Sequence, residues 1–569
     1  MPTKYLAVTI AGAVSLGSYE AGAMYEIFDA IRQHNENPTT ISLGDFIRID
    51  VLTGASAGGM TAAILAQKLL FAKNEFVDAT GKSAPYDNPL YNTWVLGIGI
   101  DALLNTVDKP VADGGDPATL SILSSNLIQQ IATRTLAQAD STGNIPLNGG
   151  PHNAVDPLRG IRLGLALTNL NGVNYGYNLI GGDRFQYTDF SDQMLRFFSI
   201  SDRSMAPWQE ISRAAVACGA FPFAFRTKDL PRQRADYEPS DTLEPWPANA
   251  QSYTFTYSDG GVLQNQPLGM AKNLVDLNDN HFGNDNRYYL FVSPSPLDGR
   301  QDLDLHESDT SLVRIAGRLI DVYMGQAVFR DWIQVKALNE KIALLDSRAK
   351  ALADALRSRL INPADLSKAS DEILDLLYPA GHIGETKDDA LARLRLQYSG
   401  QDNYLLGLQN DEIDALLRGV LTLEKAANLG DHDEMRVYGL VTQSGKLAGA
   451  GVSAFVGFLD QAFRDHDYGW GRKVAQALLA NPQFNAAGQL GPIRYTPAPI
   501  RPINTTLDGL KLNDIPRADV DTLKKGLKRR ANQMIDDAFS NPIEKYPTQL
   551  GVDLALSLLL DWEFSQDHQ

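Results

Sequence analysis

Cysteine is nearly absent from this chain of 569 residues, which contains only Cys218. An intramolecular disulfide is therefore excluded, and so is a metal cluster held by several cysteines. This composition fits a reducing compartment, so we expect a cytoplasmic protein, with a peripheral position at the membrane as an alternative. We interpret Cys218 itself as a small buried residue.

Long hydrophobic runs and an excess of positive charge are also missing. The longest apolar stretch near the C-terminus, GVDLALSLLLDW, is shorter than the roughly 20 residues that a membrane-spanning helix needs. The formal net charge of −17 argues against unspecific binding to nucleic acids, which depends on a basic patch. Contact with a membrane would have to use apolar surface or a local basic patch.

The first 300 residues alternate β-rich apolar runs with helical patterns, which indicates an α/β domain with a largely parallel sheet. The opening run LAVTIAG superficially suggests a signal peptide, but Ser15, Gly17, Ser18 and Glu20 soon interrupt it, and we interpret it as a buried first strand. The five predicted strands are YLAVTI, FIRIDVL, IRLGLAL, YTFTYS and YYLFVS. The three predicted helices are SYEAGAMYEIFDAIRQH, AGGMTAAILAQKLLFA and MAPWQEISRAAVACGA.

Composition changes near residue 300, where strand signals give way to long amphipathic patterns. We therefore divide the chain into a catalytic α/β domain at 1–300, a helical insert or cap at 301–445, and a mostly helical C-terminal region at 446–569 that packs on the catalytic domain. The insert is equally consistent with a lid facing the membrane and with a structural flank.

The strongest local motif is G-x-S-x-G, formed by Gly54, Ser56 and Gly58 between a predicted strand and a predicted helix. A sharp turn at this place forces the serine into a strained conformation, and flanking residues without bulk let the chain pass. The serine oxygen then lies at a helix N-terminus, where free N–H groups favour developing negative charge. We interpret Ser56 as a nucleophile.

A serine hydroxyl needs a base that takes its proton. The chain has eight histidines, and none lies in an evident strand-end loop of the first domain with a suitable acid upstream. His281 is the least unsuitable, but it resembles a solvated turn residue. Asp259 is the better candidate, because it ends a predicted strand and is followed by Gly260 and Gly261, which allow close approach to another loop.

D-G-G occurs a second time at Asp113, between Pro110 and Pro117, with no strand before it. We interpret that copy as a turn. Aspartate has a low unperturbed pKa, so Asp259 needs partial desolvation to act as a base near neutral pH.

Ser56 and Asp259 give the chain a resemblance to patatin-like phospholipases, which pair a G-x-S-x-G serine with the aspartate of a D-G-G/A motif and use no histidine. AAVACGAFPFAF, at 214–225, resembles the family's helix and proline turn ahead of the aspartate strand. The resemblance covers roughly residues 5–275 and extends more weakly to GFLDQAFRDHDYGWGR, at 457–472, which is similar to a segment of larger bacterial patatin-related proteins. It implies a three-layer α/β/α hydrolase domain.

The resemblance also implies an oxyanion loop after the first strand, where the family has G-G-G-x-[RK]-G. The matching residues run from Gly12 to Gly17, and two glycines and the basic residue are missing. The backbone N–H groups of Gly12, Ala13 and Val14 would be the donors, because Ala13 and Val14 can still donate if the turn keeps a negative φ.

The resulting hypothesis is a lipid acyl hydrolase of the phospholipase A or lysophospholipase type that works through an acyl-enzyme and takes its substrate from a membrane or micelle surface. No cofactor and no metal are expected, and neither is a nucleic-acid partner. The alternatives are a catalytically weak scaffold that binds lipid or protein, a transacylase, and a histidine-dependent esterase. The sequence leaves the oligomeric state open.

Overall fold

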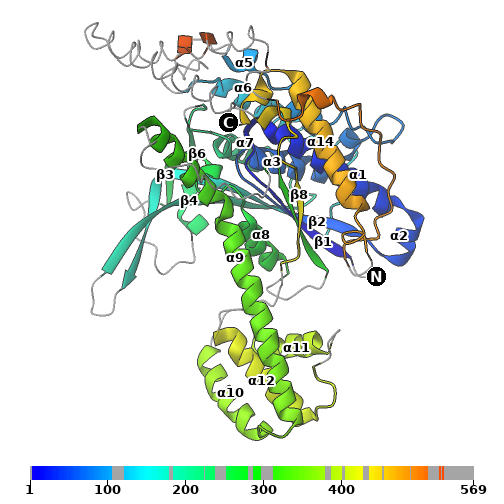
Figure 1. The fold of residues 1–569 in the computed structure, drawn as a ribbon, viewed down its shortest axis with the longest axis vertical. Coiled ribbons are helices and arrows are strands. Elements are labelled where there is room, and N and C mark those ends of the chain that lie inside the picture. The colour runs from blue at the N-terminus through cyan, green and yellow to red at the C-terminus, as the bar shows by residue number, and fades with distance from the viewer. Residues whose placement is uncertain are drawn as a thin grey trace. The chain divides into compact units, whose positions relative to one another are not determined.

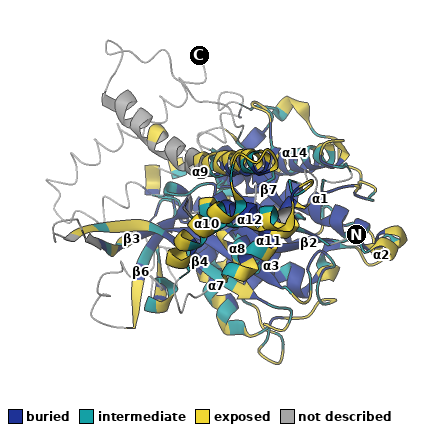
Figure 2. Cartoon of the chain, turned by 90° about the horizontal axis from the view of Figure 1, so that it is seen from below, coloured by how far each residue is buried: buried dark blue, intermediate teal, exposed yellow. Residues whose placement is uncertain are grey.

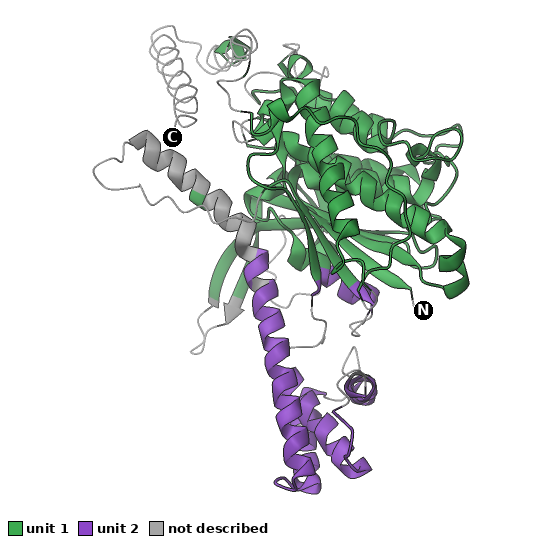
Figure 3. Ribbon diagram, turned by 45° about the vertical axis from the view of Figure 1, so that its right-hand side comes forward, with its two compact units in different colours: residues 1–271, 288–330, 437–569 green, residues 272–287, 331–436 purple. Residues whose placement is uncertain are grey.

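The structure is a computed structural model that forms two compact units. The described residues are 3–104, 121–178, 184–222, 224–237, 251–279, 286–295, 312–378, 386–399, 404–426, 435–450, 454–486, 489–510, 515, 525–526 and 528–530. Unit 1 contains residues 1–271, 288–330 and 437–569, and unit 2 contains residues 272–287 and 331–436 (Figure 3). The three-part division expected from the sequence stays a prediction.

A mixed eight-stranded sheet forms the centre of unit 1. Its order is β5-β6-β3-β2-β1-β7-β8, and β4 pairs with β3 outside this path. The strands are β1 (Lys4–Ile10), β2 (Ile47–Gly54), β3 (Ile161–Asn178), β4 (Arg184–Phe198), β5 (Lys228–Gln233), β6 (Ser252–Asp259), β7 (Arg287–Ser293) and β8 (Val437–Val441). β1, β2 and β3 are parallel neighbours, as are β7 and β8, whereas β4 and β6 run antiparallel to β3.

Helices lie on both faces of this sheet, which explains why most residues of its central strands β1 and β2 are buried. α1 (Gly17–Glu36) and α14 (Gln461–Ala480) lie side by side on one face (Figure 1). α3 (Ser56–Phe71) and α7 (Met205–Cys218) pack on the same face, in one hydrophobic cluster with α1 and α14, and α6 (Ser125–Leu136) packs against α7. On the opposite face, Met270 of α8 (Leu268–Asn278) packs with Ala166 of β3. β1 and β2 are almost fully buried between the layers, while the far end of β3 is exposed (Figure 2).

The predicted fold class is thereby confirmed as a three-layer α/β/α arrangement. All five predicted strands and all three predicted helices of the first 300 residues are present. The shorter elements of unit 1 are η1 (Val14–Leu16), α2 (Pro38–Leu43), η2 (Lys73–Phe76), α4 (Pro89–Tyr91), η3 (Asn92–Leu96), α5 (Ile100–Leu104), η5 (Arg234–Tyr237), η7 (Gly260–Val262), η9 (Ala448–Ala450), η10 (Val456–Phe458) and η11 (Thr505–Leu507). α8 (Leu268–Asn278) begins in unit 1 and ends in unit 2.

Unit 2 is helical, as the amphipathic patterns indicated. It contains the C-terminal part of α9 (Leu312–Arg357), together with α10 (Pro363–Leu377), α11 (Lys387–Tyr398) and α12 (Asn410–Ala426). Leu374, Leu394 and Leu417 belong to its hydrophobic core. The large helical region predicted from the sequence is therefore present.

Strand register brings two distant segments of unit 1 together. β3 lies between β2 and β6 and pairs with both of them. Its register therefore determines where the ends of β2 and β6 lie along the sheet. Gly54 at the end of β2 is opposite Leu165, and Asp259 at the end of β6 is opposite Leu167. The residue two positions after Gly54 is Ser56, so the two candidate residues converge at one edge of the sheet.

Candidate active site

Ser56 lies at the turn between β2 and α3 and is the first residue of that helix. Its φ is +51°, in the left-handed region that residues with a Cβ rarely adopt. A single residue in this region costs roughly 1–2 kcal/mol, so the surrounding structure must hold it there. The strained serine that the motif predicted is present.

Close backbone contacts explain the glycines on both sides of Ser56. A Cβ added at Gly58 would lie 2.3 Å from the carbonyl oxygen of Ala11, and one added at Gly54 would lie 2.4 Å from the carbonyl oxygen of Gly58. Backbone atoms cannot yield at such distances without moving the strand. The G-x-S-x-G spacing thus lets α3 begin directly against the end of β1.

Asp259 ends β6 and is 2% exposed. Its Oδ2 accepts a hydrogen bond of 2.6 Å from Ser56 Oγ, and its Oδ1 accepts one of 2.6 Å from the Gly261 N–H. Two backbone contacts fix the residue: its N–H donates to the Ala220 carbonyl at 3.0 Å, and its own carbonyl accepts from Thr168 Oγ1 at 2.7 Å.

Gly260 permits this strand end to sit tightly on the sheet. A Cβ at this position would lie 2.0 Å from the carbonyl oxygen of Ala166 on β3. At Gly261 an added Cβ would lie 2.6 Å from Asn265 Oδ1 and 2.9 Å from Asp259 Oδ1. Both glycines of the D-G-G motif are therefore required by close approach.

Burial changes the acidity of the Asp259 carboxyl group. Desolvation raises its pKa to about 7, and the hydrogen bonds from Ser56 and the Gly261 N–H oppose this rise. An aspartate with a pKa near neutrality can accept a proton from a neighbouring hydroxyl much more readily than a solvated one.

The loop from Gly12 to Gly17 (the 12–17 loop) follows β1 and passes close to Ser56. The Gly12 N–H donates to the Asn265 carbonyl at 3.0 Å, so this amide already has a partner. Among the described residues, the N–H groups of Ala13 and Val14 have none. Asn265 also explains Gly12, because an added Cβ would lie 2.0 Å from Asn265 Oδ1.

The condition of a negative φ is met at Ala13 (φ −142°) but not at Val14, whose φ is +51°. A β-branched residue in this region is a conformational outlier. At Val14 the turn therefore has a backbone conformation that glycine adopts readily and other residues rarely do. Gly17 ends the loop. The Trp94 ring explains the glycine at this position, because an added Cβ would lie only 2.6 Å from it.

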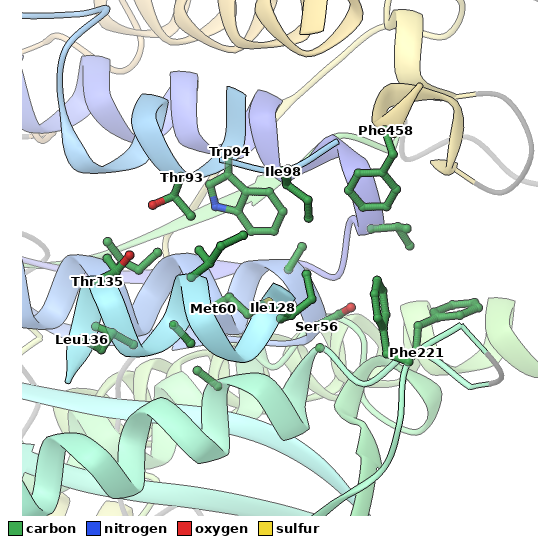
Figure 4. A pocket seen from close by; sticks show the side chains of 18 residues that line it. Ser56, Met60, Thr93, Trp94, Ile98, Ile128, Thr135, Leu136, Phe221 and Phe458 are labelled. Carbon is green, nitrogen blue, oxygen red and sulfur yellow. The ribbon is translucent and has the colours of Figure 1, made fainter. Parts of the chain in front are cut away.

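An apolar pocket begins at Ser56 and runs between α3 and α6. Figure 4 shows Ser56 at one end, beside Phe221 and Phe458, and Thr93, Thr135 and Leu136 at the other. Its lining residues are Val14, Ser56, Ala57, Met60, Ile64, Thr93, Trp94, Ile98, Ile128, Ile131, Ala132, Thr135, Leu136, Ala215, Gly219, Phe221, Phe225 and Phe458. No charged side chain is among them, so this pocket suits a hydrocarbon chain.

The described histidines make their hydrogen bonds elsewhere than at Ser56. His466 contacts the carboxylates of Asp467 and Asp508 with its two ring nitrogens, at 3.1 Å each. His34 contacts the Asp45 carbonyl, and burial lowers the pKa of His152 to about 3. His281 and Asp113 lie outside the described residues. The described part of the chain contains no cluster of His, Cys, Asp and Glu that could hold a metal ion.

Sequence reasoning missed most of the pocket. Ile128, Ile131 and Ala132 come from α6, which was not predicted, although Ser124 and the apolar spacing of this segment are typical of a capped amphipathic helix. Phe458 comes from a segment about 400 residues after Ser56. The predicted burial of Cys218 is confirmed, and its Sγ lies 3.9 Å from the Gly54 carbonyl oxygen.

Comparison with known proteins yields one family model, a patatin-like phospholipase, which matches residues 8–272. An uncharacterized protein of Sinorhizobium fredii, y4iI, is 24% identical over 403 residues, covering 58% of this chain and 54% of that protein. The chain thus spans about half the length of this relative. The crystal structure of VipD from Legionella pneumophila aligns with 99% of this chain and 85% of its own at 11% identity, with a TM-score of 0.22, which supports no statement about this chain.

Proposed function

We propose that this chain is a lipid acyl hydrolase whose nucleophile is Ser56 and whose base is Asp259, and the match of residues 8–272 to the patatin-like phospholipase model supports this proposal. The observation that carries this proposal is the 2.6 Å hydrogen bond from Ser56 Oγ to Asp259 Oδ2 at the end of an apolar pocket. A nucleophile, a base and a binding site for an acyl chain are thereby adjacent.

In the first step, Asp259 accepts the proton of Ser56 as Oγ attacks the ester carbonyl carbon. The tetrahedral intermediate collapses, the bond to the leaving alcohol breaks, and Asp259 returns the proton to that alcohol oxygen. Water then attacks the acyl-enzyme with Asp259 again as base, which releases the fatty acid and restores Ser56. No other side chain is needed for the proton transfers.

The oxyanion of the intermediate requires hydrogen-bond donors. We assign this role to the N–H groups of Ala13 and Val14, which have no partner among the described residues, and not to Gly12, whose N–H donates to Asn265. The N-terminus of α3 adds a favourable dipole at Ser56. Each such donor is worth about 10²–10³ in rate.

The pocket supports an ester with a hydrocarbon chain as the substrate. Among the described residues that line it, Ser56, Thr93 and Thr135 carry hydroxyl groups and Trp94 an indole N–H, and the two threonines lie at the end away from Ser56 (Figure 4). A lipid presented at a membrane or micelle surface would place its acyl chain here. None of the described helices is long and apolar enough to cross a bilayer.

A panel of lipid esters tests this proposal with three variants. We expect Ser56→Ala to abolish fatty-acid release, and Asp259→Asn to lower kcat by about 10²–10⁴-fold, the usual contribution of a general base. His281→Ala should keep the wild-type rate. Equal loss in a histidine variant would contradict the dyad, and transfer of the acyl group to a second lipid would identify a transacylase. Folded protein without hydrolysis or acyl transfer would favour a binding scaffold.

A further inference from the structure

α14 packs against α1 through two close backbone contacts. A Cβ at Gly22 of α1 would lie 2.1 Å from the Tyr468 carbonyl oxygen, and a Cβ at Gly471 of α14 would lie 2.0 Å from the Tyr19 carbonyl oxygen. The helices therefore touch at their backbones. Since α1 begins at Gly17, α14 is anchored to the helix that carries the 12–17 loop.

Two polar residues of α14 hold the chain segments that precede this helix. These segments are residues 448–450 and 454–458, here called the wall segments. The first of the two residues is Asp467, which is fully buried and accepts hydrogen bonds from the N–H groups of Ala448 (2.7 Å) and Gly449 (2.9 Å).

The second is Arg464, whose guanidinium is buried and bonded to carbonyl groups. It donates from Nη1 to Gly457 at 2.9 Å and to Phe458 at 3.3 Å, and from Nε to Val95 at 3.1 Å. No ion pair of Arg464 occurs in the described part of the chain. Its hydrogen bonds therefore join η10, which carries the pocket residue Phe458, to the segment of Trp94 and Val95.

The wall segments touch the 12–17 loop at three points. The Ser15 hydroxyl donates to the Ala454 carbonyl. A Cβ at Gly457 would lie 2.5 Å from Ser15 Oγ, and a Cβ at Gly449 would lie 3.0 Å from Leu16 Cδ2. Two residues of the loop therefore pack directly on backbone that Arg464 and Asp467 hold in place.

We propose that Arg464 and Asp467 are positioning residues, which hold the wall segments against the 12–17 loop and so keep the N–H groups of Ala13 and Val14 aimed at the oxyanion. The inference rests on the proposed function. Its physical basis is that Val14 has a positive φ without being glycine, and such a conformation persists only where neighbouring structure determines it. The support comes from residues beyond 272, where the family model ends.

A matched pair of glycine variants tests this role. Gly457→Ala places a methyl group against Ser15 and should displace the loop. In Gly469→Ala, within α14, the atoms nearest to the added Cβ belong to the side chains of Ile503 and Ile500, at 3.3–3.8 Å. We expect Gly457→Ala to lower kcat about 10-fold to 100-fold with KM unchanged, because a misplaced donor weakens binding of the transition state alone. Gly469→Ala should behave as wild type.

Asp467→Asn provides a second variant in case Gly457→Ala does not fold. An amide offers one acceptor oxygen instead of two, so one of the N–H groups of Ala448 and Gly449 loses its partner. The same fall in kcat at constant KM is expected, and Asp467→Glu should restore part of it. A fall in thermal stability with unchanged kcat in both Gly457→Ala and Asp467→Asn would show a purely structural role and overturn the proposal.

Hydrogen exchange keeps this test separate from the proposed function. In the peptide that contains residues 12–17, exchange should be faster in Gly457→Ala and Asp467→Asn than in wild type or Gly469→Ala, whether or not the protein turns over an ester. Unchanged exchange would contradict the positioning role. A different outcome is that the wild-type protein is inactive but exchange in this peptide is still faster in Gly457→Ala. That result would contradict the proposed function and leave the positioning of the loop supported.

Discussion

At the scale of single residues, the reactive pair depends on burial as much as on proximity. Ser56 and Asp259 are separated by 203 positions in the chain and meet through a 2.6 Å hydrogen bond. Both could be singled out from the sequence, because G-x-S-x-G and D-G-G each follow a recognisable strand. The value of the Asp259 pKa could not be predicted, because desolvation depends on residues brought together from several elements.

The pKa of Asp259 predicts a pH dependence of hydrolysis. Burial raises this pKa to about 7, and only the deprotonated carboxylate can act as the base. We therefore expect kcat/KM to rise with pH, to fall about tenfold for each unit below pH 7, and to level off above it. A profile measured with a soluble ester between pH 5 and pH 9 checks this. An acidic limb near pH 4 would mean that the carboxyl group is solvated.

One pocket residue predicts how acyl-chain length is selected. Ala132 lines the pocket and lies on α6 between Ile128, which is near Ser56, and Leu136, at the other end of the pocket (Figure 4). Ala132→Leu should therefore block the path of a long chain and leave short chains unaffected. We expect at least about a tenfold loss in kcat/KM for a palmitoyl ester relative to a butyryl ester. Thr133→Leu, on the exposed side of the same helix, is the control. Equal losses for both esters would place the acyl chain elsewhere.

At the scale of elements, predictions succeeded where the local pattern was strong. β1 and β2 are rich in apolar and β-branched residues and are buried on both faces, and α1 and α3 show helical spacing. β4 was missed because its sequence, RFQYTDFSDQMLRFF, contains one β-branched residue and several polar ones. Its strand conformation comes from antiparallel pairing with β3 over most of its length.

The contacts of α14 could not be predicted from local pattern. The segment 457–472 was recognised as similar to part of larger patatin-related proteins, but nothing in its sequence shows that Arg464 binds the carbonyl of Val95, 369 positions earlier. Likewise, Gly22 and Gly471 show no local sign that they face each other's helix. Such pairings follow from the whole fold.

A buried ion pair between α1 and α14 predicts a stability effect. Arg472 Nε lies 2.8 Å from Glu26 Oε2, and both side chains are fully buried. Arg472→Met should lower the free energy of unfolding by about 3–5 kcal/mol, because it leaves a buried charge unpaired. Desolvation already raises the pKa of Glu26, so the loss should shrink as the pH falls and Glu26 takes up a proton.

Urea unfolding followed by tryptophan fluorescence measures this effect. Glu26→Gln combined with Arg472→Met should recover part of the loss, since no charge is then buried. Arg501→Met, which removes a half-exposed arginine, is the control and should change the free energy by less than about 1 kcal/mol. An Arg472→Met protein as stable as wild type at pH 8 would show that α14 is not held by this pair.

At the scale of the whole molecule, the chemistry proposed for this chain is confined to unit 1. The pocket, the reactive pair and the 12–17 loop all belong to it, and so do the wall segments and α14 from the C-terminal part of the chain. The family model ends at residue 272, so it omits Phe458, Arg464 and Asp467. Truncation after residue 272 would therefore remove part of the site.

The most direct test of the central claim is covalent labelling of Ser56. A fluorophosphonate probe should modify the wild-type protein once, with the adduct mapped by mass spectrometry to the peptide that contains Ser56. Ser56→Ala should remain unlabelled, and Asp259→Asn should react more slowly. An unlabelled wild-type protein, under conditions that label a control serine hydrolase, would contradict the account, and so would labelling that persists in Ser56→Ala.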